Sequence, residues 1–146
     1  MRAVIQRVKW GRVKVNGNVV GETKKGLVIL LGISVDDTEE SAKYLAEKCA
    51  NLRIFNDSEG KMNLSAIDVS GEILSISQFT LYADTRKGRR PSFVGAADPI
   101  KGEKLYDKFN QYISDTGLKV KTGVFGAMME VELLNDGPVT IIVDSK

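Results

Sequence analysis

The order of apolar and polar residues predicts strands in the first third of the chain and again near residue 75. MRAVIQRV, residues 1–8, alternates imperfectly and is rich in β-branched side chains, which favours a strand. RVKVNGNVVGE, residues 12–22, divides at Asn16-Gly17, a dipeptide typical of a two-residue hairpin turn. The continuous apolar run from Gly26 to Ser34 is typical of a fully buried strand. EILSISQFTLY, residues 72–82, alternates again and is expected to be a strand throughout.

Two segments have the apolar spacing and end signals of helices. Asp37 is expected to cap the first helix, with Glu40 three residues later, and its apolar stripe consists of Ala42, Leu45, Ala46 and Cys49. The second helix begins at Asp98-Pro99, a capping residue followed by a proline at the first helical position. Gly117 is suited to its C-terminal end, and its buried stripe consists of Leu105, Phe109, Tyr112 and Ile113. Cys49 is therefore expected in the core, without a basic partner to activate its thiol.

The remainder of the chain, residues 118–146, is β-rich and ends in VTIIV before the last residues. The total is seven or eight strands and two helices, with the strands mostly in consecutive runs. This order predicts the α/β class: a mixed, largely antiparallel sheet or open barrel with two main helices packed on one side. At 146 residues we expect a single domain, residues 1–146, that buries a core without disulfide bonds.

Composition excludes several kinds of chemistry. The chain has no histidine and one cysteine, so zinc sites of the Cys/His type and every mechanism with histidine as the base are excluded. The acidic residues form no cluster resembling a magnesium cage, and neither GxGxxG nor a P-loop is present. We therefore expect no metal and no cofactor. A net charge of +2 allows a nucleic-acid partner only through a local basic surface.

The N-terminus carries Arg2, Arg7 and Lys9, with no long apolar stretch behind them. We expect neither a signal peptide nor a membrane span, and a cytoplasmic protein.

Two polar stretches do not fit a plain scaffold. In SISQFTLY, residues 75–82, polar side chains fall on both faces of the expected strand, so some of them need partners in the core or at an interface. The alternative is a strand with one solvated face. TRKGRRPSF, residues 85–93, is either a solvated loop or a local grip on a phosphate backbone. It places four cations within five positions, namely Arg86, Lys87, Arg89 and Arg90.

NDGPVT, residues 135–140, is typical of a turn between two β-rich runs. Pro138 disfavours a central strand position, because proline has no N–H to donate to a neighbouring strand. The bond between Gly137 and Pro138 precedes a proline, and only peptide bonds of this kind adopt the cis form at modest cost. A cis bond at a tight turn would point successive carbonyl oxygens in one direction, where they could accept hydrogen bonds from an ammonium group.

Together these segments resemble the D-aminoacyl-tRNA deacylase family (D-tyrosyl-tRNA(Tyr) deacylase), and the resemblance covers essentially the whole chain. SQFTL, residues 77–81, is similar to the family's first signature, and NDGPVT to its second, usually written N-x-G-P-[VF]-T. MRAVIQRV resembles its opening strand, and GRRPSF and GVFGAMM resemble its connecting segments. One departure is Trp10-Gly11, where small or moderate strand residues are expected.

The resemblance implies a three-layer homodimer that hydrolyses the ester between a D-amino acid and the 3′-terminal adenosine of tRNA. It implies a cis bond before Pro138, and a turn that reaches across the dimer interface to the partner's SQFTL segment. The expected catalytic residues are Ser77, Gln78, Phe79, Thr80, Gly137 and Pro138. The residues expected to bind substrate are Phe125, Met129, Asn135 and Thr140. The residues expected to contact tRNA phosphates are Arg86, Lys87, Arg89 and Arg90. For Phe125 and Met129, ordinary core packing is the alternative.

An enzyme that accepts many D-amino acids must recognise what they share, and must exclude L side chains with rigid atoms. Backbone suits this role because it has no rotamer that can relax. Glycine has no side chain to exclude, so glycyl-tRNA is an expected substrate. A methyl group at Gly137 is expected to enter the cleft and cripple activity without disturbing the fold. Thr80 is either the nucleophile or a residue that positions water. We favour hydrolysis assisted by the RNA's own 2′-hydroxyl, with backbone N–H groups near Phe79 and Thr80 as an oxyanion hole.

Two other classes of function are compatible with parts of the sequence. A non-catalytic RNA-binding module would use the cations of residues 86–90 and leave both signatures without a role. A dimeric β-barrel for a small ligand would show no salt-sensitive affinity for RNA.

Overall fold

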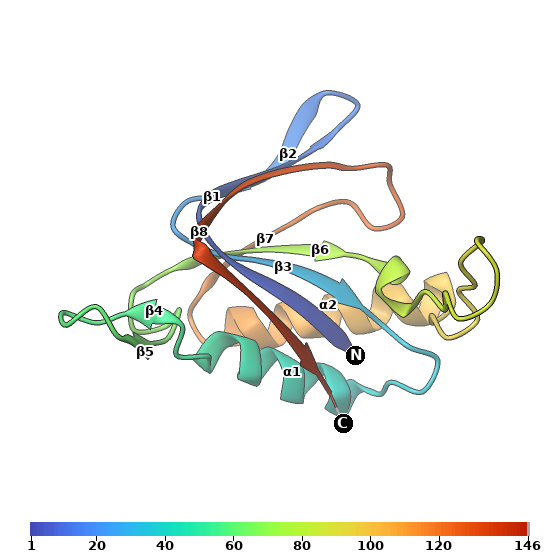
Figure 1. Ribbon diagram of the computed structural model, residues 1–146. Coiled ribbons are helices and arrows are strands. Elements are labelled where there is room, and N and C mark those ends of the chain that lie inside the picture. The colour runs from blue at the N-terminus through green and yellow to red at the C-terminus, as the bar shows by residue number, and fades with distance from the viewer. Residues whose placement is uncertain (146) are drawn as a thin grey trace.

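The computed structural model describes residues 1–145, which form a curled sheet with both main helices on one face (Figure 1). The helices are α1 Glu39–Asn51 and α2 Pro99–Asp115, and a short 3₁₀ helix, η1, spans Phe79–Tyr82. The strands are β1 Arg2–Val15, β2 Asn18–Thr23, β3 Gly26–Gly32, β4 Phe55–Asn56, β5 Met62–Leu64, β6 Glu72–Ser77, β7 Lys119–Thr122 and β8 Glu130–Asp144. The predicted α/β class with a mixed, largely antiparallel sheet is confirmed.

The length of β1 explains how the sheet curls. The strand order is β2-β1-β3-β6-β7, and β8 also pairs with β1. The pairs of β1 with β2, β3 and β8 are antiparallel, whereas β3, β6 and β7 run parallel to one another. The first half of β1 pairs with β3 and its last residues pair with β2, while β8 follows its whole length. One long strand thus joins the flat part of the sheet to the arch above it (Figure 1).

Trp10-Gly11 lies where β1 changes partner. A Cβ atom at Gly11 would lie 2.7 Å from Cγ2 of Val28, so the sheet can fold closely only over a glycine here. Trp10 is 38% exposed, with the guanidinium of Arg12 5.4 Å from its ring centroid. The departure from the family pattern therefore concerns packing at the bend.

The expected hairpin and the second helix cap are both confirmed. Asn16 and Gly17 have φ values of 50° and 79°, the left-handed conformation that a two-residue hairpin needs at both positions. The Asp98 carboxylate accepts hydrogen bonds from the N–H groups of Ile100 and Lys101. These bonds satisfy donors that the first turn of α2 leaves free.

The first helix is capped differently from the prediction. Thr38, not Asp37, is the cap, and it forms a reciprocal capping box with Ser41. Asp37 is buried, where it accepts a hydrogen bond from the N–H of Ser34 and forms an ion pair with the ammonium group of Met1. Burial alone would raise the pKa of Asp37, but these partners lower it below its usual value. The carboxylate is thus used to hold the chain's first residue, which lies 36 positions away in sequence.

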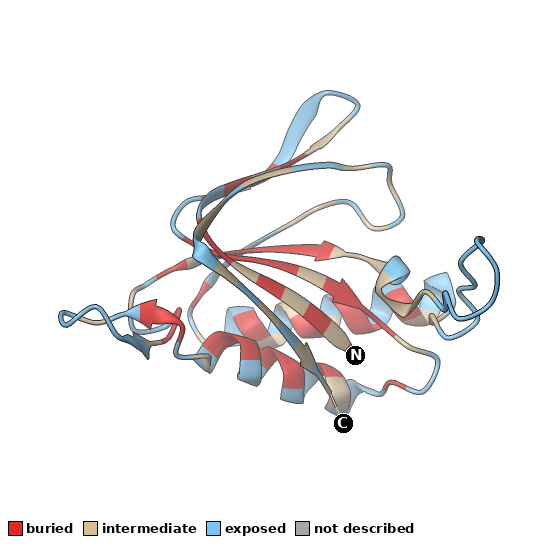
Figure 2. Ribbon diagram, in the orientation of Figure 1, coloured by how far each residue is buried: buried red, intermediate tan, exposed pale blue. Residues whose placement is uncertain are grey.

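Apolar side chains cover both faces of the sheet. The larger cluster lies between the sheet and the helices, whose inner faces are buried (Figure 2). The smaller cluster lies on the other face of the sheet and consists of Val8, Val13, Val28, Leu74 and Ile76. Cys49 belongs to the larger cluster, and burial raises the pKa of its thiol to about 12. The prediction that Cys49 is a core residue is confirmed. None of the helices within residues 1–145 has the length and apolar character needed to cross a membrane.

Candidate functional site

The first candidate segment, Ser77–Thr80, leaves the sheet. Strand β6 ends at Ser77, so the prediction of a strand through Tyr82 is wrong for its last five residues, which form Gln78 and η1. The N–H of Gln78 donates to the carbonyl of Leu31 (2.8 Å), and its carbonyl accepts from Leu81 (3.2 Å). These two bonds turn the chain as it leaves β6, next to the end of the neighbouring strand β3. Gln78 and Thr80 therefore need no partners inside the sheet, which explains polar residues on both apparent faces.

The turn fits because Gly32 lies beneath it. A Cβ atom at Gly32 would lie 3.0 Å from Cβ of Leu81 and 3.2 Å from the carbonyl oxygen of Gln78. A larger residue would push η1 away from the sheet. Of the candidate side chains, Ser77 is half-buried opposite Leu31, whereas Phe79 is 58% exposed and Thr80 is exposed.

The Thr80 hydroxyl has one partner. The side-chain amide nitrogen of Gln78 donates a hydrogen bond to its oxygen. A hydroxyl has one hydrogen to donate and two lone pairs, so Thr80 keeps its hydrogen free. Within residues 1–145, no carboxylate or thiol is hydrogen-bonded to Thr80 that could remove this hydrogen. The geometry suits a donor that orients a water molecule or a substrate oxygen better than it suits a nucleophile.

The second candidate segment, Asn135–Thr140, lies within one strand instead of between two. Both of its flanks pair with β1, as Thr140 pairs with Gln6 and Asn135 pairs with Val8. Residues 136–139 therefore face Arg7 alone and form a bulge in β8. The expectation of a turn between two β-runs is wrong, because the chain continues in the same direction along the same partner. Proline is tolerated here since the bulge leaves the ladder of strand hydrogen bonds.

Side chains hold the bulge in place of a partner strand. The Asn135 amide oxygen accepts from the N–H of Val139 (3.0 Å). The Thr140 hydroxyl oxygen accepts from the amide nitrogens of Asn135 (3.0 Å) and Gln6 (3.2 Å). The bond between Gly137 and Pro138 is cis, as the resemblance implies, and both residues are exposed. The bulge thus presents backbone to the outside on a base of hydrogen-bonded side chains.

Arg7 supports the bulge from inside the molecule. Its side chain is 8% exposed, and its Nε donates to the carbonyl of Asp136 (3.2 Å) and lies 3.5 Å from that residue's carboxylate. Its Nη1 donates to the carbonyl of Ile54 (2.7 Å) and to Oδ1 of Asn56 (3.3 Å). Arg7 is not among the site residues predicted from the sequence. A signal was present, because Arg7 follows Ala3 and Ile5 at alternate positions on the buried face of β1.

Gly137 is required by the bulge itself. Its φ is +119°, and a Cβ atom would lie 2.7 Å from Nη2 of Arg7 and 2.9 Å from Cγ2 of Val139. A methyl group at Gly137 would therefore disturb the bulge locally, and the expectation that the overall fold stays intact remains a prediction. A substitution would displace Arg7 or strain the backbone, because L side chains rarely adopt this conformation.

The basic segment is a loop with a closed neck. Asp84 and Ser92 exchange two backbone hydrogen bonds, of 2.7 and 3.0 Å, and residues 85–91 project between them at the end of the molecule (Figure 1). Arg86 folds back onto Asp84, and this pairing lowers the pKa of the Asp84 carboxyl to about 2. Within the described part of the chain, Lys87, Arg89 and Arg90 take part in no ion pair. Three of the four predicted cations are therefore available to a polyanion.

Phe125 and Met129 pack against different parts of the molecule. The side chain of Phe125 packs against α2, with its ring centroid 5.9 Å from that of Tyr106. Met129 packs against the smaller apolar cluster, and its sulfur would lie 2.5 Å from a Cβ atom at Gly123. Both side chains are half-buried. Within one chain, each therefore has the core contacts that the alternative interpretation expected.

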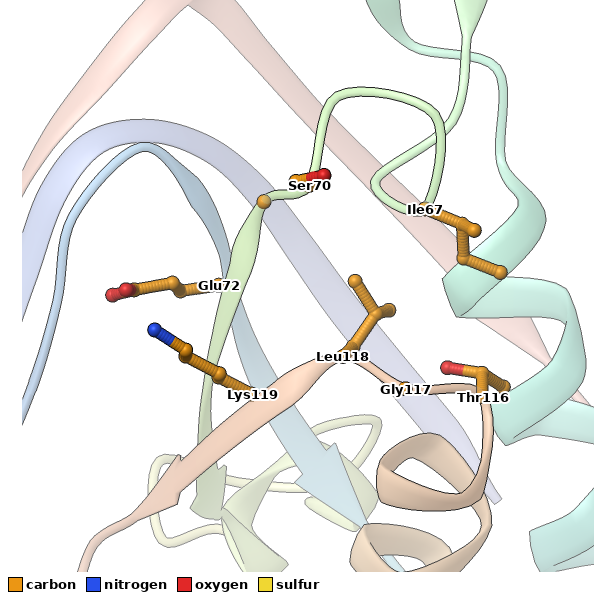
Figure 3. A pocket seen from close by; sticks show the side chains of 8 residues that line it. Ile67, Ser70, Glu72, Thr116, Gly117, Leu118 and Lys119 are labelled. Carbon is orange, nitrogen blue, oxygen red and sulfur yellow. The ribbon is translucent and has the colours of Figure 1, made fainter.

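A hollow of about 250 Å³ lies at the opposite end of β6 from Thr80, between Ile67 and Thr116 (Figure 3). Glu72 and Lys119 extend side by side at its edge. The Glu72 carboxylate accepts from the N–H of Lys24 (2.9 Å), and this bond, together with nearby lysines, lowers its pKa. The polar groups are thus already paired with neighbouring strands. Among residues 1–145, no three Cys, Asp or Glu side chains are grouped as metal ligands.

The two signature segments form separate hydrogen-bond networks in one chain. Gln78 bonds to Thr80, and Asn135 and Gln6 bond to Thr140, but no hydrogen bond within residues 1–145 connects the two groups. What each offers is distinct. The first presents a free hydroxyl hydrogen and exposed aromatic surface, and the second presents a firmly supported stretch of backbone.

The family model and the curated proteins that match this chain have the same description, a tRNA deacylase. The family described as D-Tyr-tRNA(Tyr) deacylase matches residues 4–144. Curated proteins named D-aminoacyl-tRNA deacylase, from Desulfatibacillum aliphaticivorans and from Bacillus cytotoxicus, are 60% identical to it over 146 residues, and the match covers 100% of each chain.

Two solved structures share the fold. One is described as c-Myc DNA Unwinding Element Binding Protein, is 40% identical, and superimposes with a TM-score of 0.94 over 100% of this chain and 99% of its own. The other is described as a probable eukaryotic D-amino acid tRNA deacylase. It is 20% identical, with a TM-score of 0.85 over 98% of both chains, and supports the fold alone.

Proposed function

This chain belongs to the D-Tyr-tRNA(Tyr) deacylase family and is an ester hydrolase of the D-aminoacyl-tRNA deacylase type, and we propose that it works without a side-chain base. The observation that carries the proposal is the environment of Thr80, whose oxygen accepts from Gln78 and has no basic partner among the described residues. Its substrate is the ester between a D-amino acid and the 3′-terminal adenosine of tRNA.

In the proposed reaction the RNA supplies the proton transfer. The oxygen of a water molecule bonds to the ester carbonyl carbon, and the bond from that carbon to the 3′-oxygen breaks. The 2′-hydroxyl gives its proton to the 3′-oxygen and takes one from the attacking water. Backbone N–H groups near Phe79 and Thr80 stabilise the negative charge that develops on the carbonyl oxygen. The products are the free D-amino acid and a tRNA that ends in a 3′-hydroxyl.

Chirality is sensed by the backbone of the bulge in β8. Residues 136–139 are exposed or half-buried at the surface, while Arg7 and Asn135 hold them from within. Such a support suits a role in which carbonyl oxygens receive the α-ammonium group and rigid atoms exclude an L side chain. Gly137 and Pro138 carry this role, with Asn135 and Thr140 as their support.

The bulge acts in the active site of a second copy of the chain. We place the twofold contact on the outer face of β8, because Leu134 and Ile142 flank the bulge and are 46% and 64% exposed. Exposed apolar residues beside a backbone projection are typical of a protein interface. The exposed Thr80 and Phe79 of one chain would then receive the bulge of the other.

A direct test compares D-tyrosyl-tRNA, L-tyrosyl-tRNA and glycyl-tRNA with the purified protein. We expect release of D-tyrosine and glycine and none of L-tyrosine. Nucleic-acid binding without catalysis is the alternative, and the 40% identical structure is indeed described as a DNA-binding protein. RNA binding without stereoselective release would favour this alternative, and equal release of both enantiomers would contradict the backbone mechanism.

The role of Thr80 is tested by Thr80→Ala. Loss of one hydrogen bond to substrate or water corresponds to roughly a tenfold decrease in kcat. Loss of a nucleophile would lower kcat far more, by about 10⁶-fold when the nucleophilic serine of a serine protease is removed. We expect the smaller effect, measured in single-turnover hydrolysis of D-tyrosyl-tRNA. Detection of a covalent D-tyrosyl adduct on Thr80 by mass spectrometry would overturn the substrate-assisted route.

The role of the 2′-hydroxyl is tested on the RNA instead. D-tyrosyl-tRNA that ends in 2′-deoxyadenosine is expected to react at least ~100-fold more slowly, the usual contribution of general acid–base catalysis. Its affinity for the protein should stay within a few-fold, which separates chemistry from binding. A normal rate would show that some protein group carries the proton.

A further inference from the structure

The structure exposes an aromatic pair whose second ring, that of Phe93, has no role in the proposed chemistry. The rings of Phe79 and Phe93 meet edge to face, with centroids 5.0 Å apart and planes at 68°. Phe79 is 58% exposed and Phe93 is 37% exposed. Aromatic side chains of this size normally contribute to a core. Two of them in contact outside the core indicate a surface that binds a ligand or another macromolecule.

The pair lies between the cationic loop and Thr80. Phe93 is the first residue after the neck that Asp84 and Ser92 close, so it stands at the base of the loop that carries Lys87, Arg89 and Arg90. Phe79 directly precedes Thr80 in η1. The ring contact between them therefore connects the loop to the proposed catalytic segment, and a chain that touched both would pass over the two rings.

This combination has the chemistry of a single-stranded nucleic-acid site. Single strands bind where cations follow the phosphates and aromatic rings stack on the bases. If the terminal adenosine lies at Thr80, as the proposed function requires, the preceding nucleotide lies one phosphodiester step away, toward the cations. The proposed function places the bulge of a second copy beside Thr80 and Phe79, so the part of this surface left to the RNA is Phe93, next to three cations that favour a polyanion.

We propose that Phe93, supported edge-on by Phe79, stacks on the base of the nucleotide that precedes the terminal adenosine of the tRNA. The inference rests on the proposed function, since the position of the adenosine sets the position of its neighbour. It makes Phe93 a residue that binds the RNA end, and not one that takes part in bond breaking.

The test uses two substrates that differ in this nucleotide. D-tyrosyl-tRNA contains it, and 3′-O-D-tyrosyl-adenosine lacks it. Phe93→Leu keeps apolar volume but removes the aromatic face, and Phe93→Tyr keeps the face. We expect Phe93→Leu to lower the ratio of kcat/KM on tRNA to kcat/KM on the adenosine ester about tenfold, mainly through KM. Phe93→Tyr is expected to restore the ratio.

Three other outcomes would overturn the inference. An equal loss on both substrates would mean that Phe93 only supports η1, and an unchanged ratio would mean that nothing stacks there. A change in sedimentation for Phe93→Leu would assign the pair to a protein contact. Wild-type protein inactive on both esters would instead refute the proposed function. The stacking is then decided by the affinities of the trinucleotide CCA and of adenosine for wild type and Phe93→Leu, which should differ for CCA alone.

Discussion

Replacing Gly137 with alanine is expected to lower kcat/KM on D-tyrosyl-tRNA by about 100-fold, because a displacement of the bulge by ~1 Å misplaces the groups that orient the substrate. The added methyl would meet Nη2 of Arg7 at 2.7 Å and Cγ2 of Val139 at 2.9 Å. The φ of +119° adds backbone strain of about 1–3 kcal/mol, which corresponds to a decrease in Tm of roughly 3–10 °C. Both effects come from the same site, so activity and stability fall together.

Gly117→Ala is the matched control. Gly117 also has a positive φ, +91°, but a Cβ atom there would meet nothing within 4 Å, and the residue lies at the C-terminal end of α2. The Tm of the Gly117→Ala variant should fall by a similar amount, while its deacylase activity stays normal. Steady-state kinetics and thermal unfolding of the two variants separate backbone strain from damage to the site. Full activity of Gly137→Ala would refute the view that the bulge backbone senses chirality.

Replacing Arg7 with methionine is expected to destabilise the fold by about 5 kcal/mol or more, since hydrogen bonds from a charged donor contribute ~1.5–3 kcal/mol each and three carbonyl or amide oxygens would lose theirs. These oxygens belong to Asp136, Ile54 and Asn56. Methionine keeps most of the buried volume, so the loss reports hydrogen bonding and not a cavity. The bulge would also lose its inner support, and we expect deacylation to fall with it.

Arg12→Met on the same strand provides the comparison. Arg12 is paired with Glu132, but both side chains are more than one-third exposed, and pairs of this kind contribute about 0–1 kcal/mol. Urea unfolding of both variants gives their free energies of unfolding, which can be compared directly if the two depend equally steeply on urea concentration. If Arg7→Met were as stable as Arg12→Met, the bulge would be held by Asn135 and Thr140 without help from the buried guanidinium.

The candidate site was found only in part before the fold was known. The segments Ser77–Thr80 and Asn135–Thr140 were located by their unusual composition and by their resemblance to two signatures. Gln6, Arg7 and Phe93 were not, because each matters through a neighbour distant in the sequence. Phe93 meets Phe79 beside the neck that Asp84 and Ser92 form, and Arg7 meets Asp136 across 129 positions.

Sequence alone determined the features that depend on a few adjacent residues. The Asn16-Gly17 turn, the Asp98-Pro99 cap and the buried run from Gly26 follow from local conformational preferences and apolar spacing. The lack of histidine in the sequence also limited the chemistry to mechanisms without an imidazole base.

Only the tertiary structure decided what the proline-containing segment is. Whether residues 136–139 form a hairpin turn or a bulge depends on which strand pairs with each flank, and both flanks pair with β1 from the other end of the chain. The same holds for Asp37, which could cap α1 but is held instead by Met1. Strand register and burial are set by contacts between distant segments, and no local pattern contains them.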